Sequence, residues 1–330
     1  MTRTAAPILE RKQPKAKSKR VSHWQTNLFV FLMLAYPVIQ FLIMWLGVNI
    51  NSIFLTFKAF YNGKLVWVFQ DPDIWDGNAA NFWSTLFYNY VTLFQSFSSA
   101  DTQSLFNASL VYFVISCLIT LPISMLFSYF VFKKIAGNSF FKVIFFLPCI
   151  LPLFILTMTY SLSLSSNGLV AGVLKWMHVD YGTFFDNLFI GNNAQWMVWL
   201  FCIWAGIGYD VILLTAGMSR IPRDILESCK MDGVSPMREF FKIIIPLSWP
   251  TITTLFIFGM MSVFTVTFQP FFLTSGQYNT MTIGLQIYQA SGGSGLQAPA
   301  TLGLFCSVVG APIIVATRWG LNKCYQNVGF

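Results

Sequence analysis

Residues 105–134 read LFNASLVYFVISCLITLPISMLFSYFVFKK. The first 28 residues of this stretch contain no Asp, Glu, Lys or Arg, and two lysines follow directly. A helix needs about 20 mostly apolar residues to cross the hydrocarbon core of a bilayer. This run is long enough, so it predicts a membrane-spanning helix over residues 105–132 and an integral membrane protein of the all-α class.

The composition of the whole chain agrees with a membrane protein. Hydrophobic residues make up 55% of the 330 residues, while charged residues make up only 10%. An ordinary soluble domain has about 25% charged residues, so a soluble fold of this size has too little polar surface to cover the apolar side chains. The composition excludes a disordered chain, a fibrous repeat, a disulfide scaffold and a nucleic-acid-binding protein, in spite of the net charge of +8.

Five further apolar runs have the length of a membrane span. They cover residues 28–47, 140–164, 196–218, 249–273 and 301–319. The first run follows a basic segment, but it is longer than the apolar part of a signal peptide and no small-residue cleavage site follows it. We therefore expect an uncleaved anchor and six transmembrane helices in total.

The positions of the basic residues predict the orientation of these spans. Six spans place 17 of the 20 Lys and Arg residues on the side of the N-terminus, and only Lys58, Lys64 and Lys175 on the other side. Cytoplasmic segments of membrane proteins carry such an excess of Lys and Arg, so both termini are expected in the cytoplasm. The expected division is a basic cytoplasmic tail (1–26) that contacts membrane lipids, a first transmembrane helix (27–57), an extracytoplasmic loop (58–103) folded as a small cap with short interfacial helices, and a five-helix core (104–325).

Inside that core, the cytoplasmic loop of residues 219–248 is long and charged. With the two residues after it, it reads SRIPRDILESCKMDGVSPMREFFKIIIPLSWP. Pro222 is favourable at a helix start, Gly233 tolerates the positive φ of a tight turn, and Ser235 can cap a second helix. The pattern predicts a helix-turn-helix on the cytoplasmic face, either as an ordinary interfacial hairpin or as a surface for a partner protein.

The same loop resembles the signature loop of the membrane subunits of binding-protein-dependent ABC importers. That signature runs Glu-Ala-Ala, three residues, Gly, nine residues, Ile, one residue, Leu-Pro. Here it is matched by Glu227-Ser228-Cys229, Gly233, Ile243 and Ile245-Pro246, with Ser and Cys in place of the two alanines and Ile in place of Leu. The segments LTSG (273–276) and GNSFFK (137–142) resemble the carbohydrate branch of this family.

The resemblance implies the partners and the division of work. In such importers two related membrane subunits, in the sugar branch usually two different chains, associate with two ATPase subunits and an external solute-binding protein in the cell membrane of a prokaryote. The ATPase would use ATP and Mg²⁺, and this chain would have no catalytic residue, no metal site and no cofactor of its own. Glu227 would pair with a basic residue of the ATPase, Ser228 and Cys229 would allow close approach, and Asp232 and Gly233 would form the turn.

One charged residue lies away from the ends of the expected spans. Asp210 occurs in WAGIGYDVILL, and ionisable residues inside a membrane are costly and usually functional. It is expected either to contact a sugar or a gate, or to make a structural hydrogen bond or an ion pair with a cytoplasmic arginine such as Arg220.

The fifth expected span offers polar side chains to a substrate. In a continuous helix Ser262, Thr265 and Gln269 share one face, and sugar hydroxyls need such donors and acceptors, with the ring of Phe268 nearby. Helix–helix hydrogen bonding inside the bundle is the alternative. Because no Lys or Arg lies from Ile243 to Val315, a stretch that includes the fifth span, we expect a neutral oligosaccharide or glycoside, unless a partner chain supplies basic groups.

Two other classes of membrane protein were considered. A secondary, ion-coupled transporter usually carries paired ionisable residues at the bilayer midplane and often shows two similar halves, whereas this sequence shows one Asp and no repeat. A membrane receptor or scaffold has no need of the coupling loop. The sequence therefore favours the membrane subunit of an ATP-driven sugar importer.

Overall fold

The computed structural model describes residues 23–135, 137–179, 184–293 and 295–324. Most of the predicted basic tail (1–26) lies outside these residues. The chain forms two compact units, residues 1–51 and residues 52–330, and each is described by itself.

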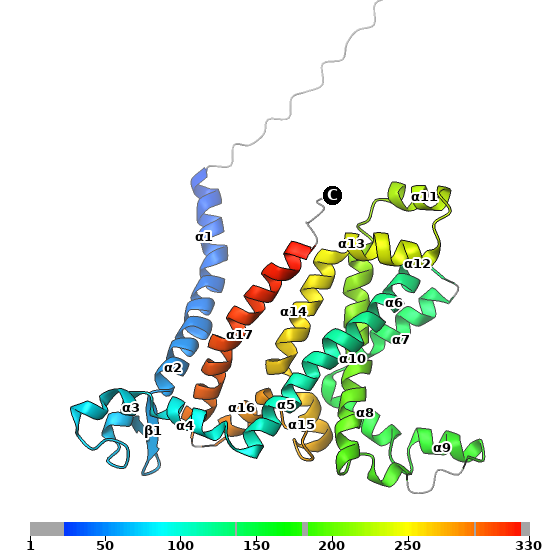
Figure 1. The fold of residues 1–330 in the computed structure, drawn as a ribbon. Helices are drawn as coiled ribbons and strands as arrows, with labels where there is room; N and C mark the ends of the chain where they lie inside the picture. Colours follow the sequence, from blue (N-terminus) through cyan, green and yellow to red (C-terminus); the bar gives the residue numbers. More distant parts are fainter. Residues whose placement is uncertain (1–22, 136, 180–183, 294, 325–330) are drawn as a thin grey trace, which may run out of the picture. The chain divides into compact units, whose positions relative to one another are not determined.

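The elements of the described residues are almost all helical (Figure 1). The α-helices are α1 (His23–Gln40), α2 (Val48–Leu55), α3 (Phe82–Leu86), α4 (Tyr88–Ser96), α5 (Ala100–Val114), α6 (Leu121–Phe132), α7 (Asn138–Ile150), α8 (Leu153–Ser163), α9 (Leu169–Trp176), α10 (Asn192–Met218), α11 (Arg223–Met231), α12 (Pro236–Glu239), α13 (Ile245–Leu247), α14 (Trp249–Thr265), α15 (Phe268–Thr274), α16 (Ile283–Ser291) and α17 (Gln297–Cys324). Three π-helical segments continue neighbouring helices, η1 (Phe41–Gly47), η4 (Ile115–Thr120) and η6 (Phe240–Ile244), and three 3₁₀ turns are η2 (Val68–Gln70), η3 (Ala79–Asn81) and η5 (Phe184–Asn187). Two strands, β1 (Lys58–Tyr61) and β2 (Lys64–Trp67), form an antiparallel pair.

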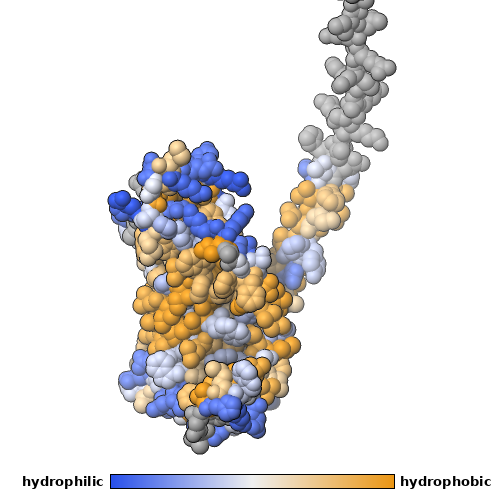
Figure 2. Space-filling model, turned by 90° about the vertical axis from the view of Figure 1, so that its right-hand side faces the viewer, coloured by the Kyte–Doolittle hydropathy of each residue, from blue (hydrophilic) through white to orange (hydrophobic). Residues whose placement is uncertain are grey.

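Four helical stretches are long and apolar enough to cross a membrane. They are Thr26–Leu55, Ala100–Phe132, Asn192–Met218 and Gln297–Lys323, and the number rises to six if each of two bent helix pairs forms one span. The all-α membrane fold is thereby confirmed. In the second unit an apolar band lies between hydrophilic ends (Figure 2), as expected for a protein surrounded by hydrocarbon.

In the second unit, α10 packs against α6, α7, α14 and α15, and α14 packs against α5 and α17. Glycines allow the closest of these approaches, since a Cβ at Gly208 of α10 would collide with the backbone of Phe145 in α7. A Cβ at Gly259 of α14 would likewise lie 2.5 Å from the sulfur of Cys117. Small residues at helix interfaces are typical of membrane bundles, where close backbone contact replaces the hydrophobic driving force.

The third expected span (140–164) is not one straight helix. It divides into α7 and α8, which meet at an angle of 112°. Pro152 stands at the break with ψ of 137°. Proline has no N–H to donate and disfavours the α conformation of the preceding residue, so the helix ends at Ile150 and restarts after the proline.

The fifth expected span (249–273) is also wrong as a continuous helix, because α14 ends at Thr265 and α15 begins at Phe268. In an unbroken helix the carbonyl of Val266 would accept from the N–H of residue 270, but that residue is Pro270. A proline ring also collides with the carbonyl four residues earlier. The hydroxyl of Thr282 donates to this Val266 carbonyl instead, at 2.6 Å.

The loop over residues 58–103 contains the expected short helices, and also a β-hairpin that the sequence analysis missed. Asn62 and Gly63 both have positive φ, 48° and 77°, as a two-residue hairpin turn requires. The side-chain amide of Asn89 in α4 donates to the carbonyls of Thr56 and Lys58, at 2.7 and 2.8 Å. These two bonds attach the start of the hairpin to α4.

Candidate coupling surface and translocation cavity

The predicted helix-turn-helix is present at residues 223–247. After α11, the N–H of Val234 donates to the carbonyl of Cys229 (3.1 Å) and the N–H of Gly233 donates to that of Lys230 (3.2 Å). This pair of hydrogen bonds is a Schellman motif, which needs a left-handed residue at its turn. Gly233 supplies it with φ of +65°, so the turn expected at Asp232-Gly233 is confirmed.

Four of the five predicted coupling residues lie on the surface of the chain. Glu227, Ser228, Asp232 and Gly233 are exposed. Cys229 is only 8% exposed and faces inward. Its small size therefore serves packing within this chain, while Glu227 and Ser228 remain available to a partner.

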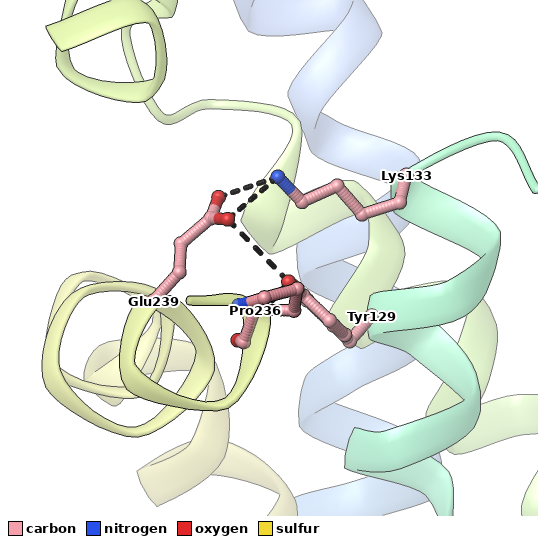
Figure 3. A network of polar contacts seen from close by, with 4 residues as sticks. All are labelled: Tyr129, Lys133, Pro236 and Glu239. Carbon is pink, nitrogen blue, oxygen red and sulfur yellow. Dashed lines mark hydrogen bonds and ion pairs between the residues drawn. The ribbon is translucent and has the colours of Figure 1, made fainter. Parts of the chain in front are cut away.

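The second helix of the loop is attached to the bundle by a polar network (Figure 3). Lys133, which follows α6, donates to both carboxylate oxygens of Glu239 in α12, at 2.6 and 2.8 Å. The hydroxyl of Tyr129 donates to the carbonyl of Pro236 at 3.2 Å and lies 3.5 Å from Glu239 Oε2. Glu239 is only 6% exposed, and a buried carboxylate needs such partners. Ser235 precedes α12 as predicted, but its side chain makes no cap hydrogen bond.

Apolar packing supports the same attachment. Phe240 and Ile244 of η6 are buried in a cluster with residues of α6, α10 and α14. The rings of Tyr129 and Phe240 lie 5.1 Å apart between centroids. Helix α12 and its continuation are therefore held to three helices of the bundle, and α11 projects beyond them (Figure 1).

A cavity of about 390 Å³ lies between the helices of the bundle. Its walls come from α5 and η4, from the ends of α7 and α8, from α10, and from the broken fifth span. Polar groups on the wall include Tyr112, Tyr209, Asp210, Ser262 and Gln269. Asp210 is the only Asp, Glu, Lys or Arg among the lining residues.

The structure brings together three of the five predicted path residues. Asp210, Ser262 and Gln269 line this cavity. Ser262 belongs to α14 and Gln269 to α15, so the two side chains come from separate helices and not from one continuous helix. Thr265 lines a different cavity, next to α16 and α17. Phe268 packs its ring on Phe272 and Tyr288.

An ion pair with Arg220, one of the alternatives considered for Asp210, is not formed. Within the described part of the chain, the only ion pair joins Lys133 and Glu239. Asp210 therefore faces the cavity without a salt bridge to Arg220. Of the alternatives considered for Asp210, its position on the cavity wall agrees with a contact to a substrate or a gate.

Two functional features escaped the sequence analysis. Tyr112 is 3% exposed and lines the cavity, and its hydroxyl makes no hydrogen bond to any described residue. The Lys133–Glu239 ion pair joins residues far apart in sequence. No local pattern marks either feature, because both depend on which helices become neighbours.

Fold and site define a multi-pass membrane protein in which a surface helix-turn-helix is attached by α12 to a bundle, and the bundle contains a cavity with several polar groups on a largely apolar wall. Residues 106–321, about two thirds of the chain, match the family of binding-protein-dependent transport system inner membrane components. The chain belongs to this family, which confirms the resemblance noted in the coupling loop.

The proteins that this chain resembles include permeases that are named for sugars and for a phosphate ester. A probable ABC transporter permease of Mycoplasma genitalium is 27% identical over 70% of this chain and 77% of its own length. The multiple sugar-binding transport system permease of Streptococcus mutans is 28% identical over 47% of this chain, and the sn-glycerol-3-phosphate permease of Agrobacterium fabrum is 24% identical over 54%. These two matches span 53% and 61% of the relatives' own lengths.

Among solved structures, the fold is similar to a chain of a bacterial ABC transporter that imports the acidic polysaccharide alginate. The TM-score is 0.71 and the identity 21%, over 91% of this chain and 96% of that chain. A second structure of the alginate transporter, in complex with its pentasaccharide-bound periplasmic protein, gives a TM-score of 0.72 at the same identity. The likeness confirms the transporter fold over nearly the whole chain.

Proposed function

We propose that this chain forms half of the translocation path of an ATP-driven sugar importer and transmits the motion of a separate ATPase to that path. One observation carries the proposal. Glu239 of the coupling loop is bonded to Lys133, and Lys133 directly follows the continuous helical stretch Ala100–Phe132, whose middle part lines the 390 Å³ cavity.

This arrangement transmits force by simple geometry. Thr120 lies on the cavity wall. A helix rises about 1.5 Å per residue, so Thr120 and Lys133 lie about 20 Å apart along one continuous helical stretch. A partner that moves α11 and α12 therefore moves the inner end of a helix whose far part touches the cavity. Glu227 and Ser228, which are exposed on α11, would contact the ATPase.

The complete importer requires further chains. We assign ATP and Mg²⁺ to the ATPase subunits, the second half of the path to another membrane subunit, and delivery of the sugar to an extracytoplasmic binding protein. The relative in the alginate transporter is described with such a periplasmic protein. The distribution of its basic residues supports a cytoplasmic position of both termini.

The proposal is tested by reconstitution of the chain with its ATPase, its second membrane subunit and its binding protein in proteoliposomes. Uptake of a sugar is expected to require ATP and the binding protein, and an ATPase subunit is expected to co-purify in detergent. Uptake that persists without ATP and follows a proton or sodium gradient would instead support a secondary transporter.

A further inference from the structure

A second cavity, of about 520 Å³, lies at the end of the bundle that carries α11. It is bordered by the end of α6, by α7, by the last turn of α10 and by α11. Its charged lining residues are Lys133, Lys134, Lys142, Arg223, Lys230 and the single acid Glu227. Such an excess of basic groups attracts an anion.

Most of these basic groups remain available. Lys133 is engaged by Glu239, whereas Lys134, Lys142, Arg223 and Lys230 form no ion pair with any residue that the structure describes. Thr215 of α10 lines the same cavity, and its hydroxyl is buried without a hydrogen-bond partner. A phosphate oxygen would satisfy this donor and the ammonium groups together.

An apolar cavity of about 290 Å³ adjoins the basic one between α6 and α7. The two share Val131, and the apolar cavity is lined by Phe127, Phe130, Ile135, Phe141 and Phe145, with Asn138 as its one polar side chain. Phe130, Ile135 and Phe141 are all more than 40% exposed, so the cavity opens to the outside of the chain. Figure 2 views the second unit from this side and shows hydrophilic residues gathered at the α11 end, directly above the apolar band.

We propose that these two cavities form a binding site for one anionic phospholipid, with the phosphate among Lys134, Lys142 and Arg223 and an acyl chain along the phenylalanines between α6 and α7. Basic pockets at the membrane surface are known to hold lipid head groups. A free anion or an acidic protein segment would need only the basic cavity. The adjoining apolar cavity, which a hydrocarbon chain fills, favours the lipid.

The site has a consequence for α11. Arg223 and Lys230 belong to α11, while Lys134 lies just after α6 and Lys142 lies in α7. A lipid phosphate bound to both groups would hold α11 against the bundle. This inference concerns lipid binding alone, so it stands or fails independently of what the protein transports.

Native mass spectrometry of the full-length chain in detergent tests the proposal, with phosphatidylglycerol and phosphatidylcholine as probes. Wild type is expected to retain phosphatidylglycerol in preference to phosphatidylcholine. Each Lys or Arg near a membrane surface contributes about 1 kcal/mol to binding anionic lipid, which corresponds to roughly tenfold or more for two residues. The variant K134Q/K142Q is therefore expected to bind phosphatidylglycerol at least about tenfold more weakly.

The matched control is R238Q/K242Q. It removes the same charge from exposed positions of the same loop region that line neither cavity, and it is expected to bind like wild type. A second variant, Ile135→Ser, tests the apolar part and is expected to lose affinity for phosphatidylglycerol while keeping all basic residues.

Three results would overturn the proposal. They are equal binding of the two lipids by wild type, an equal loss in K134Q/K142Q and in the control, and competition by inorganic phosphate at the same concentration as phosphatidylglycerol. The last result would show a site for a small anion without a role for the acyl chain. A fourth result, loss of phosphatidylglycerol binding when the ATPase subunit is added, would also overturn the proposal, because a protein segment would then occupy the basic cavity in place of the lipid.

Discussion

Lys133 and Glu239 form a bidentate ion pair, 2.6 and 2.8 Å long, between the inner end of a membrane helix and the coupling loop. The side chain of Glu239 is 7% exposed and that of Lys133 is 25% exposed. The carboxylate of Glu239 is therefore shielded from water, while the side chain of Lys133 remains partly accessible to it. The pair joins α12 to the residue that follows α6, so in the proposed function it would serve as a mechanical link as well as a stabilising contact.

Lys133→Met is expected to weaken this link. Removal of one partner leaves a buried carboxylate without its cation, which costs about 3–5 kcal/mol in a fully buried pair and about 2 kcal/mol here, since Lys133 is partly exposed. Thermal unfolding of the protein in detergent measures the loss. Arg238→Gln, an exposed position of the same loop, is the control, and the double variant K133M/E239L is expected to recover much of the stability. Equal stability of K133M and the control would show that the pair contributes nothing.

Gly233→Leu is expected to leave the protein inserted but to impair docking of the ATPase. The backbone at Gly233 has φ of +65°, and a Cβ there meets no atom of this chain within 4 Å. In the isolated chain Leu and Ala should therefore cost the same, about 1–2 kcal/mol of left-handed strain, while Leu should reduce docking further than Ala. Co-purification of the ATPase and ATP-dependent uptake are the measurements.

Glu227→Ala is expected to weaken docking less than Gly233→Leu, because it removes one exposed contact and leaves the turn intact. A Gly233→Leu variant with normal ATP-dependent uptake would refute the assigned role of this turn.

Thr282→Val is expected to destabilise the broken fifth span. The Thr282 hydroxyl donates to the Val266 carbonyl at 2.6 Å and accepts from the N–H of Leu285 at 3.2 Å. The side chain is fully buried, so valine leaves both groups without a partner at a cost of about 1–3 kcal/mol. Thr282→Ser keeps the hydroxyl and is expected to unfold close to wild type. Valine and serine variants of equal stability would contradict this role of the hydroxyl.

Single cysteines at Asn78 and Ser235, in a background without native cysteines, are expected to react from opposite sides of the membrane. Both positions are exposed, and the distribution of Lys and Arg predicts residue 78 outside and residue 235 in the cytoplasm. Labelling with a membrane-impermeant thiol reagent before and after permeabilisation of cells is the measurement. Labelling of both positions in intact cells would exclude the six-span topology.

The features that the sequence predicted well are those with local signals. The apolar run that predicts α10 is recognised from its own residues, and Gly233 by itself indicates the turn after α11. The hairpin at Asn62-Gly63 carried an equally local signal, the Asn-Gly turn between alternating residues, and was available to sequence reasoning. The helix break before Pro270 could also be predicted from the sequence, because proline has no N–H to donate to the carbonyl of residue 266.

The site itself depends on contacts that no local pattern contains. Ser262 and Gln269 were assigned to one helical face, and they do line one cavity, although the helix breaks between them; the opposite wall comes from α10 and other elements that the sequence pattern does not identify. Thr265, predicted on the same face, lies on another cavity. The Lys133–Glu239 pair arises from the packing of α6 on η6, two elements that α7 to α12 separate in sequence, so no local pattern indicates it.

The substrate is expected to be neutral. Asp210 is the one charged group on the wall of the 390 Å³ cavity, and a phosphorylated or uronic substrate would bring a second negative charge beside it in a medium of low dielectric constant. Such a charge costs several kcal/mol to bury unless Lys, Arg or helix N-termini compensate it. Uptake by the reconstituted importer should therefore favour neutral oligosaccharides over glycerophosphate and uronates, and Asp210→Asn should raise the uptake of the anionic compounds relative to the neutral ones. A strong preference for glycerophosphate or a uronate that survives replacement of the arginines in the second membrane subunit would contradict this prediction, since the basic groups would then have to come from this chain.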